Sequence, residues 1–356
     1  MSWKRLLNFR KNEVIGLDIG SYAVKIVALH KDDTGYTIAG ANITEIIQTE
    51  TDSDDQRAYI TKAIRDCSRG AGTKSKLAVC GVSGPDVAVR DFEFPSLPDD
   101  EIFGAVRLEA SQICPFNTAD SAIDYQLVQE TDEQDSENKT QGVLVAATNT
   151  LVKSKVQYAK DSHLHCVLMD VNGLALLNCF NELAEENEKS QTGYGTAILN
   201  VGASHTTLAI MAENGRPFIR DLTFAGNDII EQIAIDRKMT IEAVQQMLYE
   251  DTELSRAELN NSMKKACGKL FADVSETLRF YTAQAQLKRI DKILACGGFS
   301  LTKGFVNLLS NQTGIETMLW NPLEKIYTGK NKTQKEIIAK NGPAMVIAAG
   351  LAMRSI

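Results

Sequence analysis

The chain has 356 residues, a net charge of −8 and 44% hydrophobic residues. This length exceeds what one hydrophobic core fills, so at least two domains are expected in a globular protein. The acidic balance argues against a protein built mainly to bind nucleic acid, but a nucleotide needs only local backbone donors. The seven cysteines contain no closely spaced pair, and no run reaches the roughly 18 to 20 apolar residues of a membrane helix. These features predict a cytoplasmic protein without a transmembrane segment.

The first part of the chain predicts a small sheet with one helix. Residues Glu13–Leu29 read as two strands joined by a tight turn, because the apolar run VIGLDIG is broken at Asp18 and Gly20 and AVKIVAL alternates. A helical pattern follows over residues 52–69, and Leu77–Val82 has the composition of a buried strand.

Composition shifts after Gly84-Pro85, and residues 84–165 predict a small α/β insertion. The polar, apolar-poor loop TDEQDSENKTQ inside it is expected to be mobile. The predicted elements are a strand at Asp86–Pro95, a helix at Leu97–Ile113, paired strands at Ala122–Gln129 and Gln141–Thr148, and a helix at Val152–Lys160.

The second half of the chain again mixes helices and strands. The predicted elements are a helix at Met169–Asn187, a strand-turn-strand at Ala197–Met211, helices at 226–237 and 255–287, a buried strand at Ile290–Cys296, and helices at Leu301–Asn311 and Pro343–Arg354.

An internal duplication connects the two halves. The segment ILNVGASHTTLAIM aligns with GLDIGSYAVKIVAL, which lies 182 residues earlier. The alignment places Asn200 on Asp18, Gly202 on Gly20, Ala203 on Ser21, and Thr207 on Lys25. One such hairpin arises easily by chance, and its glycine then only permits a tight turn. Two copies, each opening one half of the chain, favour a shared function.

The chemistry of these turns fits a phosphate clamp. A hairpin turn containing Gly and Ser or Ala presents backbone N–H groups to an anion, and two such turns facing each other would hold a polyphosphate. Asp18 at the end of the first strand is suited to hold water on Mg²⁺. Gly297-Gly298, after a buried strand, would let the backbone approach a ring or phosphate closely.

The order of these motifs resembles the actin-like ATPase superfamily, and within it the PilM family of type IV pilus assembly proteins. The similarity covers nearly the whole chain. It rests on IGLDIGSYAVKIVAL, LPDDEIFGAVRLEASQICPF, AIDYQLV, VGASHTTLAIM, SETLRFYTAQ and IAAGLAMRS. It implies an α/β, two-lobed, actin-like fold with a duplicated ribonuclease H-like core and the inserted subdomain that PilM shares with FtsA. It also implies ATP or ADP with Mg²⁺ between the lobes.

The resemblance also implies how the chain divides. The expected parts are a first lobe core (1A) of residues 12–83 and 166–192, an inserted subdomain (1C) of 84–165, a second lobe core (2A) of 193–225 and 288–356, and a subdomain 2B of 226–287.

The family motifs carry over to individual residues. Asp18 would hold Mg²⁺ through water. The implied phosphate-binding residues are Gly20, Ser21, Tyr22, Lys25, Gly202, Ala203, Ser204 and Thr206. The implied adenosine-binding residues are Gly226, Gly297, Gly298 and Phe299.

One departure from the family pattern concerns catalysis. The second phosphate motif usually contains Asp, whereas this chain has Asn200. An amide can still hydrogen-bond a water, but it cannot take a proton or supply negative charge. The substitution weakens the case for hydrolysis more than the case for binding, so turnover is expected to be absent or very slow.

The resemblance further implies a membrane partner. Members of the family hold the N-terminal cytoplasmic tail of PilN, an inner-membrane protein, in a groove between the first lobe and the insertion. That would place this chain at the inner membrane through its partner. The candidate anchors are Ile113, Pro115 and Phe116 at the predicted helix end. Each of these residues could equally pack the insertion's own core.

Two other functions compete with the scaffold. A phosphotransferase related to sugar kinases needs an acid that takes the proton of the acceptor hydroxyl, and no such loop stands out. A filament former like FtsA or MreB remains compatible, since a heterologous contact can build filaments. FtsA relatives end in a linker and an amphipathic membrane helix, whereas this sequence stops after GLAMRSI. Self-association therefore stays open, and the scaffold is favoured.

Overall fold

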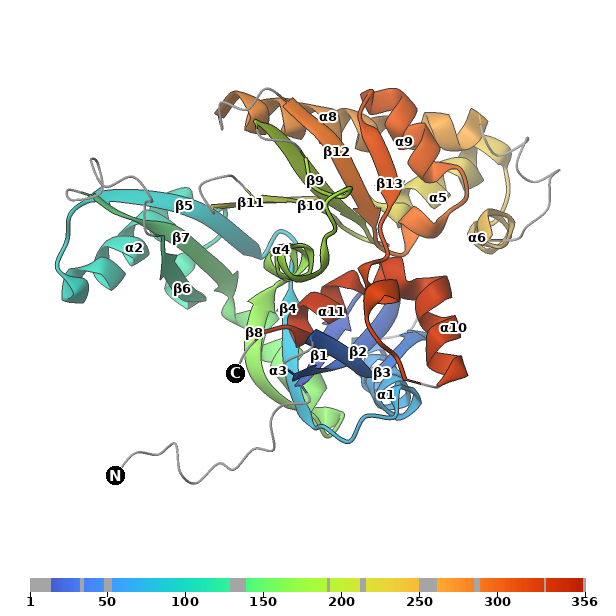
Figure 1. Ribbon diagram of the computed structural model, residues 1–356, viewed down its shortest axis with the longest axis horizontal. Helices are drawn as coiled ribbons and strands as arrows, with labels where there is room; N and C mark the ends of the chain where they lie inside the picture. Colours follow the sequence, from blue (N-terminus) through green and yellow to red (C-terminus); the bar gives the residue numbers. More distant parts are fainter. Residues whose placement is uncertain are drawn as a thin grey trace.

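A computed structural model shows two five-stranded sheets and a smaller third sheet (Figure 1). It describes residues 14–354 except 33–34, 48–52, 129–138, 191–192, 212–215, 250–260, 285–288 and 330. The basic N-terminal segment, most of the loop expected to be mobile and part of the helix predicted at 255–287 lie outside the described residues. Within the described residues, no helix has the length and apolar character needed to cross a bilayer.

The first sheet is built from five strands in the order β3-β2-β1-β4-β8. Its strands are β1 (Val14–Ile19), β2 (Ala23–Asp32), β3 (Gly35–Glu45), β4 (Leu77–Val82) and β8 (His165–Val171). The first three strands pair antiparallel, and β1, β4 and β8 run parallel. Two helices, α1 (Ser53–Ala71) and α3 (Asn149–Asp161), pack on one face.

The second sheet repeats this plan in the order β11-β10-β9-β12-β13. Its strands are β9 (Tyr194–Val201), β10 (Thr206–Met211), β11 (Pro217–Leu222), β12 (Arg289–Cys296) and β13 (Glu316–Leu319). Its helices are α5 (Gly226–Arg237), α6 (Ile241–Tyr249), α8 (Gly268–Gln284) and α9 (Phe305–Thr313). Three antiparallel strands followed by two parallel ones occur in both sheets, which confirms the duplication and the actin-like architecture.

The alternation of side chains explains which face of each sheet carries the site. In β1, Ile15 and Leu17 are fully buried in the core under α1 and α3, so Asp18 lies on the opposite face, because successive side chains point to opposite sides. In β9, Leu199 belongs to the core of the outer helices, and Ile198 to the core shared by both sheets. Asn200, two residues after Ile198, is therefore on the face of its sheet that turns toward the first lobe.

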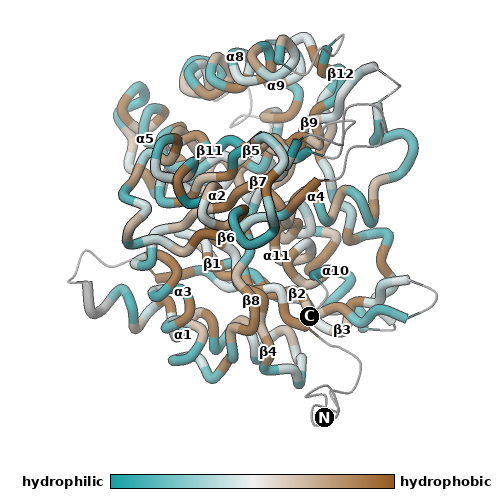
Figure 2. Tube along the Cα trace, turned by 90° about the vertical axis from the view of Figure 1, so that its left-hand side faces the viewer, coloured by the Kyte–Doolittle hydropathy of each residue, from teal (hydrophilic) through white to brown (hydrophobic). Residues whose placement is uncertain are grey.

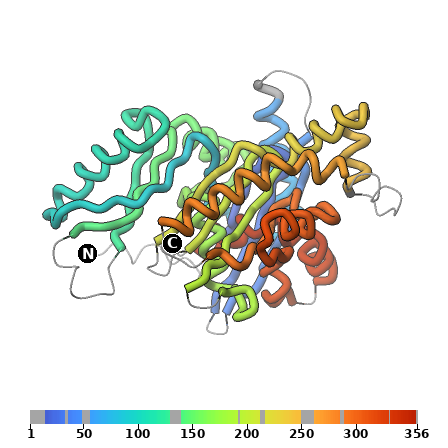
Figure 3. Tube along the Cα trace, turned by 90° about the horizontal axis from the view of Figure 1, so that it is seen from above, coloured from blue at the N-terminus to red at the C-terminus, as the bar shows by residue number. Residues whose placement is uncertain are grey.

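The insertion forms a separate layer beside the two lobes, as the view from above shows (Figure 3). Its sheet has the order β5-β7-β6. Its elements are β5 (Val87–Pro95), α2 (Asp99–Ile113), β6 (Ser121–Leu127) and β7 (Lys139–Thr148). Phe92, Val106 and Leu144 centre a small core of its own, so the chain leaves the first sheet after β4 to build an independent unit.

Two segments pack differently from the expected division of the chain. The helix α3 lies against β4, β8 and α1 of the first lobe, although it falls within 84–165. The helices α10 (Lys332–Asn341) and α11 (Val346–Ala352) pack on β3 and on β1, β2 and β4, although 288–356 was expected in the second lobe. Small residues permit the close approach of α11, since a Cβ at Gly16 would lie 1.8 Å from the Ala348 carbonyl oxygen.

The helix predicted at Met169–Asn187 is wrong at its start. Residues up to Val171 form strand β8, and α4 begins only at Asn172 and ends at Leu183. A short apolar run such as HCVLMDV does not distinguish a buried strand from a helix by periodicity alone. The strand β11, the helices α6 and α10 and the short strand β13 were not predicted.

Candidate functional site

The first of the duplicated turns places a carboxylate and an amine side by side. Asp18 and Lys25 are directly opposite each other in the β1–β2 ladder, and Lys25 Nζ lies 3.1 Å from Asp18 Oδ2. Cross-strand neighbours on one face of a sheet are close enough for such an ion pair. Gly20 closes the turn by donating its N–H to the Ala23 carbonyl at 3.1 Å, and a Cβ on it would meet Lys25 Nζ at 2.9 Å. The glycine therefore leaves room for the lysine.

A second lysine contacts the main chain at the start of this turn. Lys155, on α3, donates to the backbone carbonyl of Ile19 at 2.7 Å. Burial lowers the pKa of its amine, the nearby Asp18 carboxylate raises it, and Lys25 lowers it further. A lysine held on a main-chain oxygen fixes the position of the turn, and sequence analysis did not identify it.

The second turn has the same geometry with different chemistry. Asn200 and Thr207 face each other in the β9–β10 ladder, which is the position of Asp18 and Lys25 in the first sheet. The Asn200 Oδ1 accepts a weak hydrogen bond from the Cys296 thiol at 3.8 Å. Gly202 donates to the His205 carbonyl at 3.0 Å. The register confirms the alignment of the two repeats and brings an amide to the place where the first repeat has an acid.

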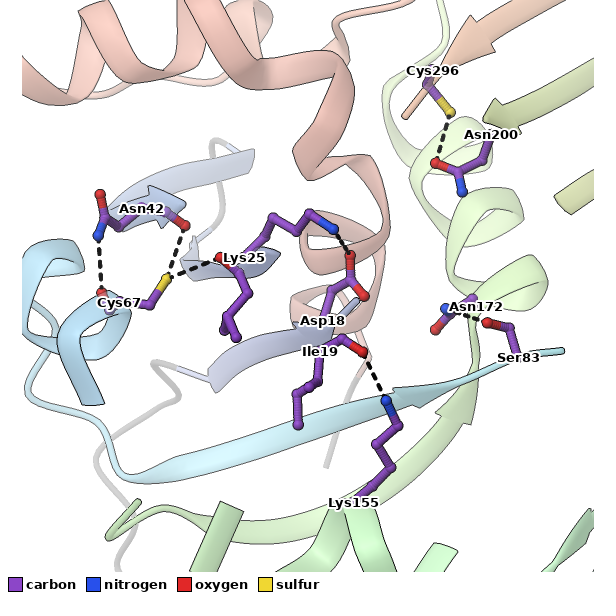
Figure 4. Close-up of polar contacts among 11 residues, drawn as sticks. Asp18, Ile19, Lys25, Asn42, Cys67, Ser83, Lys155, Asn172, Asn200 and Cys296 are labelled. Carbon is purple, nitrogen blue, oxygen red and sulfur yellow. Dashed lines mark hydrogen bonds and ion pairs between the residues drawn. The ribbon is translucent and has the colours of Figure 1, made fainter. Parts of the chain in front are cut away.

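The tips of the two turns touch across the lobes. Ser204 Oγ donates to Ser21 Oγ at 2.6 Å, although the residues are 183 positions apart. Figure 4 shows Asp18 with Lys25 on one side and Asn200 with Cys296 on the other. Strands from the two duplicated sheets thus bring an acid, an amine and an amide to the sides of the two lobes that face each other.

The residues expected around adenosine gather next to the second turn. Gly226 donates its N–H to the Gly202 carbonyl at 3.0 Å, and a Cβ on it would meet the Phe299 ring at 2.8 Å. Gly297 has a φ of +91° and lies against the backbone of Val201. A Cβ added to Gly298 would meet no other atom within 4 Å. The ring of Phe299 is buried, so it supports Gly226 from below.

Three further predicted residues take different positions. Tyr22 is 41% exposed at the tip of the first turn. Ala203 accepts a hydrogen bond from the Asn227 N–H at 2.8 Å. The hydroxyl of Thr206 is buried and donates to the Phe224 carbonyl at 2.9 Å. The Thr206 side chain therefore stabilises the sheet through this hydrogen bond.

A carboxylate that sequence analysis missed links the second lobe to the insertion. Asp221, on β11, accepts from Thr207 Oγ1 at 2.6 Å and from the Gly84 N–H at 2.7 Å. Gly84 has a φ of +97° and lies against the His205 ring, because a Cβ added to Gly84 would be 3.2 Å from His205 Nε2. An aspartate inside a strand, where it is normally depleted, is the signal that the sequence offered.

Another polar contact joins the end of β4 to the start of α4. Asn172, at the first turn of α4, donates to Ser83 Oγ at 2.9 Å and is 8% exposed. Its carbonyl oxygen has no hydrogen-bond partner among the residues that the structure describes, and a Cβ added to Gly81 would lie 2.1 Å from it. The glycine permits the ends of β4 and α4 to meet here (Figure 4).

The expected partner-binding residues lie at the end of α2 nearest the first lobe. Ile113 is half-buried against the insertion's core, Phe116 is half-buried, and Pro115 is exposed. The turn that follows is tied to the start of α3 by Asn149, which donates to Asp120 at 2.8 Å. Because α3 packs on the first sheet, this end of α2 adjoins the junction between insertion and first lobe.

Comparison with known proteins places the chain in a family. The family model described as type IV pilus assembly protein PilM matches residues 16–356. The chain belongs to the PilM family. A solved structure described as a PilM-PilN type IV pilus biogenesis complex is similar with a TM-score of 0.78 at 22% identity, covering 97% of this chain and 98% of that chain.

More distant structures share the fold of this PilM family member. The ethanolamine utilization protein EutJ from Carboxydothermus hydrogenoformans has a TM-score of 0.56 at 11% identity, covering 96% of this chain and 89% of that chain. A diol dehydratase-reactivating factor in nucleotide-free form has a TM-score of 0.54 at 10% identity, covering 96% of this chain and 99% of that chain. These likenesses concern the actin-like fold.

Proposed function

We propose that this PilM family member is a nucleotide-binding scaffold of type IV pilus assembly. It holds ATP or ADP with Mg²⁺ between its lobes and docks the N-terminal cytoplasmic tail of a PilN-like inner-membrane protein. The observation that carries the nucleotide part is the meeting of two equivalent turns, one from each duplicated sheet, at Ser21 and Ser204. Such a pair of turns is a clamp for a chain of phosphates.

The residues present fit a polyphosphate. The two serine hydroxyls bond each other at 2.6 Å, so a phosphate bound between the tips replaces that bond with bonds to its own oxygens. Glycine at positions 20 and 202 keeps the approach to the backbone free of side-chain atoms. Lys25, held by Asp18 at the base of the turn, supplies positive charge that a polyphosphate requires.

The residues also fit Mg²⁺ as a metal that arrives with the nucleotide. The described residues hold no cluster of three His, Cys, Asp or Glu side chains. Mg²⁺ keeps several waters and is bound by one or two carboxylates plus phosphate oxygens. Asp18, 5% exposed at the end of β1, is the carboxylate that would orient those waters, and the metal would neutralise phosphate charge.

The glycine-rich surface of the second lobe suits a flat ring. The backbone at Gly298 is open, and Gly226 and Gly297 bring main chain close to the second turn. A purine would lie against this glycine-rich surface, with the buried Phe299 ring forming the support beneath it. The purine would therefore be bound by main-chain atoms and by shape, and the polyphosphate by charge.

The nucleotide part is tested by thermal unfolding with and without Mg-ATP or Mg-ADP. Binding at one hundred times the Kd stabilises the fold by about 2.7 kcal/mol, which raises Tm by about 5 °C at roughly 2 °C per kcal/mol. The shift should vanish in Asp18→Asn, with each variant referred to its own nucleotide-free Tm.

The matched control is Asp66→Asn, because Asp66 is a half-buried acid on α1 that pairs with Arg69. It should keep the full shift. An unchanged Tm of nucleotide-free wild-type protein in millimolar Mg-ATP would refute nucleotide binding, and an equal loss of the shift in both variants would refute the role of Asp18.

Turnover of the bound nucleotide is proposed to be absent or very slow. The amide of Asn200 lies where the duplicated position in the first sheet has a carboxylate. Loss of a general acid or base typically costs 10²- to 10⁴-fold in rate. We expect Asn200→Asp to raise steady-state phosphate release, and a wild-type rate in the range of roughly 1 to 100 per second usual for kinases would overturn this assignment.

The partner part rests on the family and on the position of the insertion. The similar solved structure is described as a complex of PilM with PilN. In this chain, Pro115 and Phe116 follow the end of α2 near the junction with the first lobe, where a short peptide would meet both units. Peptides of this kind bind through a few apolar anchors in a groove. The proposed location is the cytoplasmic side of the inner membrane.

A calorimetric titration with the N-terminal peptide of the PilN-like protein tests the partner part. Phe116→Ala should lower the peptide affinity at least tenfold, because truncating a buried aromatic anchor costs about 2 kcal/mol or more. Phe103→Ala is the matched control, since Phe103 is a 46% exposed ring on α2, near the N-terminal end of the helix and away from Phe116. Equal losses in the two variants would place the groove elsewhere, and no binding to wild type would refute the docking.

A further inference from the structure

The charges of this acidic chain are unevenly distributed. The whole chain has 38 Lys and Arg against 46 Asp and Glu. Residues 62–76 contain Lys62, Arg65, Arg69, Lys74 and Lys76, with Asp66 as the single acid. Repulsion by the rest of the molecule opposes binding of any polyanion, so a local excess of positive charge has to be concentrated on one surface to have an effect.

The structure brings these cations together at one edge of the first lobe. Lys62, Arg65 and Arg69 are spaced three and four residues apart on the outer side of α1, and all three are exposed. Lys74 and Lys76 lead into β4 and are exposed as well. We call these five residues, together with Lys160 at the end of α3, the basic edge.

The contacts of α1 with α3 complete this surface. The two helices contact each other, and Figure 2 shows them side by side. Arg57 bonds Asp161 at 2.6 Å, and Ser162 Oγ donates to the Thr61 carbonyl at 3.3 Å. A hollow of about 300 Å³ between the helices is lined in part by Arg57, Lys62 and Arg65. Its size suits a single phosphate group and not a folded peptide.

Few acids neutralise the basic edge. Asp161 is engaged by Arg57, and Asp66 pairs with Arg69 at 3.1 Å. Among the residues that the structure describes, no salt bridge joins Lys62, Lys74 or Lys76 to an acid. The edge therefore keeps a positive field toward solvent.

The chain itself enters the fold at this edge. β1 begins at Val14 and runs parallel to β4, with Ile15 beside Ala78. The sequence before Val14 contains Lys4, Arg5, Arg10 and Lys11 with one acid, and it also contains Trp3, Leu6, Leu7 and Phe9. Basic residues accompanied by Trp, Leu and Phe are the composition of segments that bind a membrane surface.

We propose that the basic edge docks on an anionic lipid bilayer. The cations are long, mobile side chains spread along an edge, with a hollow of only headgroup size. A bilayer offers many mobile phosphates and needs no shape match, whereas a protein partner needs a complementary surface. The inference is separate from the nucleotide and peptide sites, although it agrees with the proposed position at the inner membrane.

Vesicle co-sedimentation of the full chain, without nucleotide or peptide, tests this proposal. Wild type should bind vesicles of phosphatidylglycerol and phosphatidylethanolamine, fail to bind phosphatidylcholine vesicles, and be released by about 0.5 M salt. Each lysine near such a surface strengthens binding about fivefold. The triple variant Lys62→Gln, Lys74→Gln, Lys76→Gln should therefore lose about a hundredfold in partition coefficient.

The matched control is Lys332→Gln, Lys335→Gln, Lys340→Gln on α10, which removes the same charge from exposed positions and should bind as wild type. Unchanged Tm values show that both variants fold. Equal binding by the two triple variants, or no binding of wild type to anionic vesicles, would overturn the proposal. Binding of a DNA duplex at low salt in place of vesicles would also overturn it. None of these outcomes touches nucleotide or PilN-like peptide binding.

Discussion

The contact of Asp221 with Gly84 offers a direct measure of how firmly the second lobe holds the insertion. The carboxylate accepts one bond from Thr207 in its own lobe and one from the Gly84 N–H at the start of the insertion. Asp221→Ala removes both bonds. Asp221→Asn keeps the shape, and its amide can still accept from Gly84 through Oδ1 and donate to Thr207 through Nδ2.

The magnitude follows from burial. Hydrogen bonds to a charged group contribute about 1.5 to 3 kcal/mol each, and a buried N–H left without an acceptor costs about 1 to 3 kcal/mol. Gly84 is buried and Asp221 is half-buried, so the lower part of these ranges applies. We expect the free energy of unfolding to fall by about 3 kcal/mol in Asp221→Ala and by about 1 kcal/mol in Asp221→Asn.

Differential scanning calorimetry of the nucleotide-free protein measures both effects. At roughly 2 °C per kcal/mol, Tm should fall by about 6 °C for Asp221→Ala. The control is Asp273→Ala, because Asp273 lines the same hollow of about 250 Å³ as Asp221, and its carboxylate pairs with Lys269 across one helical turn. Surface pairs of this kind contribute about 0.3 to 0.5 kcal/mol. A loss for Asp221→Ala no larger than for Asp273→Ala would refute the reasoning.

Two further predictions concern a glycine and a thiol. Gly297→Ala should destabilise the fold by about 2 kcal/mol or more in urea unfolding, because its φ of +91° disfavours a side chain and its Cβ would meet main chain at 2.4 Å; Gly298→Ala should change stability by less than about 1 kcal/mol. A hydrogen bond from the Cys80 thiol lowers the pKa of Cys166 to about 7, so iodoacetamide labelling of Cys166 should rise with a midpoint near that pH. Burial raises the pKa of Cys114, and equal labelling of the two thiols at pH 7 would contradict this prediction.

The duplicated strands were predictable because their signal is periodic and local. The run VIGLDIG and its repeat at Asn200 have alternating apolar positions, a glycine turn and a second alternating strand. The register of Asp18 with Lys25, and of Asn200 with Thr207, follows once both hairpins are assigned. Neither hairpin predicts which faces of the two sheets oppose each other, because that depends on the packing of α4 and α11 between the sheets.

The missed residues act through contacts between distant segments. Lys155 supports the first turn from α3, which is 136 positions away, and Asp221 reaches Gly84 over 137 positions. Lys155 has no local pattern that separates it from an ordinary surface charge, and Asp221 is unusual only once it is known to lie in strand β11, which was not predicted. Phe299 and Thr206 were expected to contact the nucleotide, yet their side chains are buried under neighbouring backbone, because the strand and helix that carry them turn these side chains inward.

The position of α11 affects the order in which the two lobes fold during synthesis. Every strand of the second sheet lies within the continuous stretch 194–319, so its pairing is complete before the ribosome reaches α11. The first sheet begins at Val14 but receives α11 only from residues 346–352, and until then the part of its inner face around Gly16 and Val27 lacks the helix that packs on β1 and β2. Because domains fold as units during synthesis and uncovered apolar faces aggregate, the lobe that starts the chain is the last to become stable.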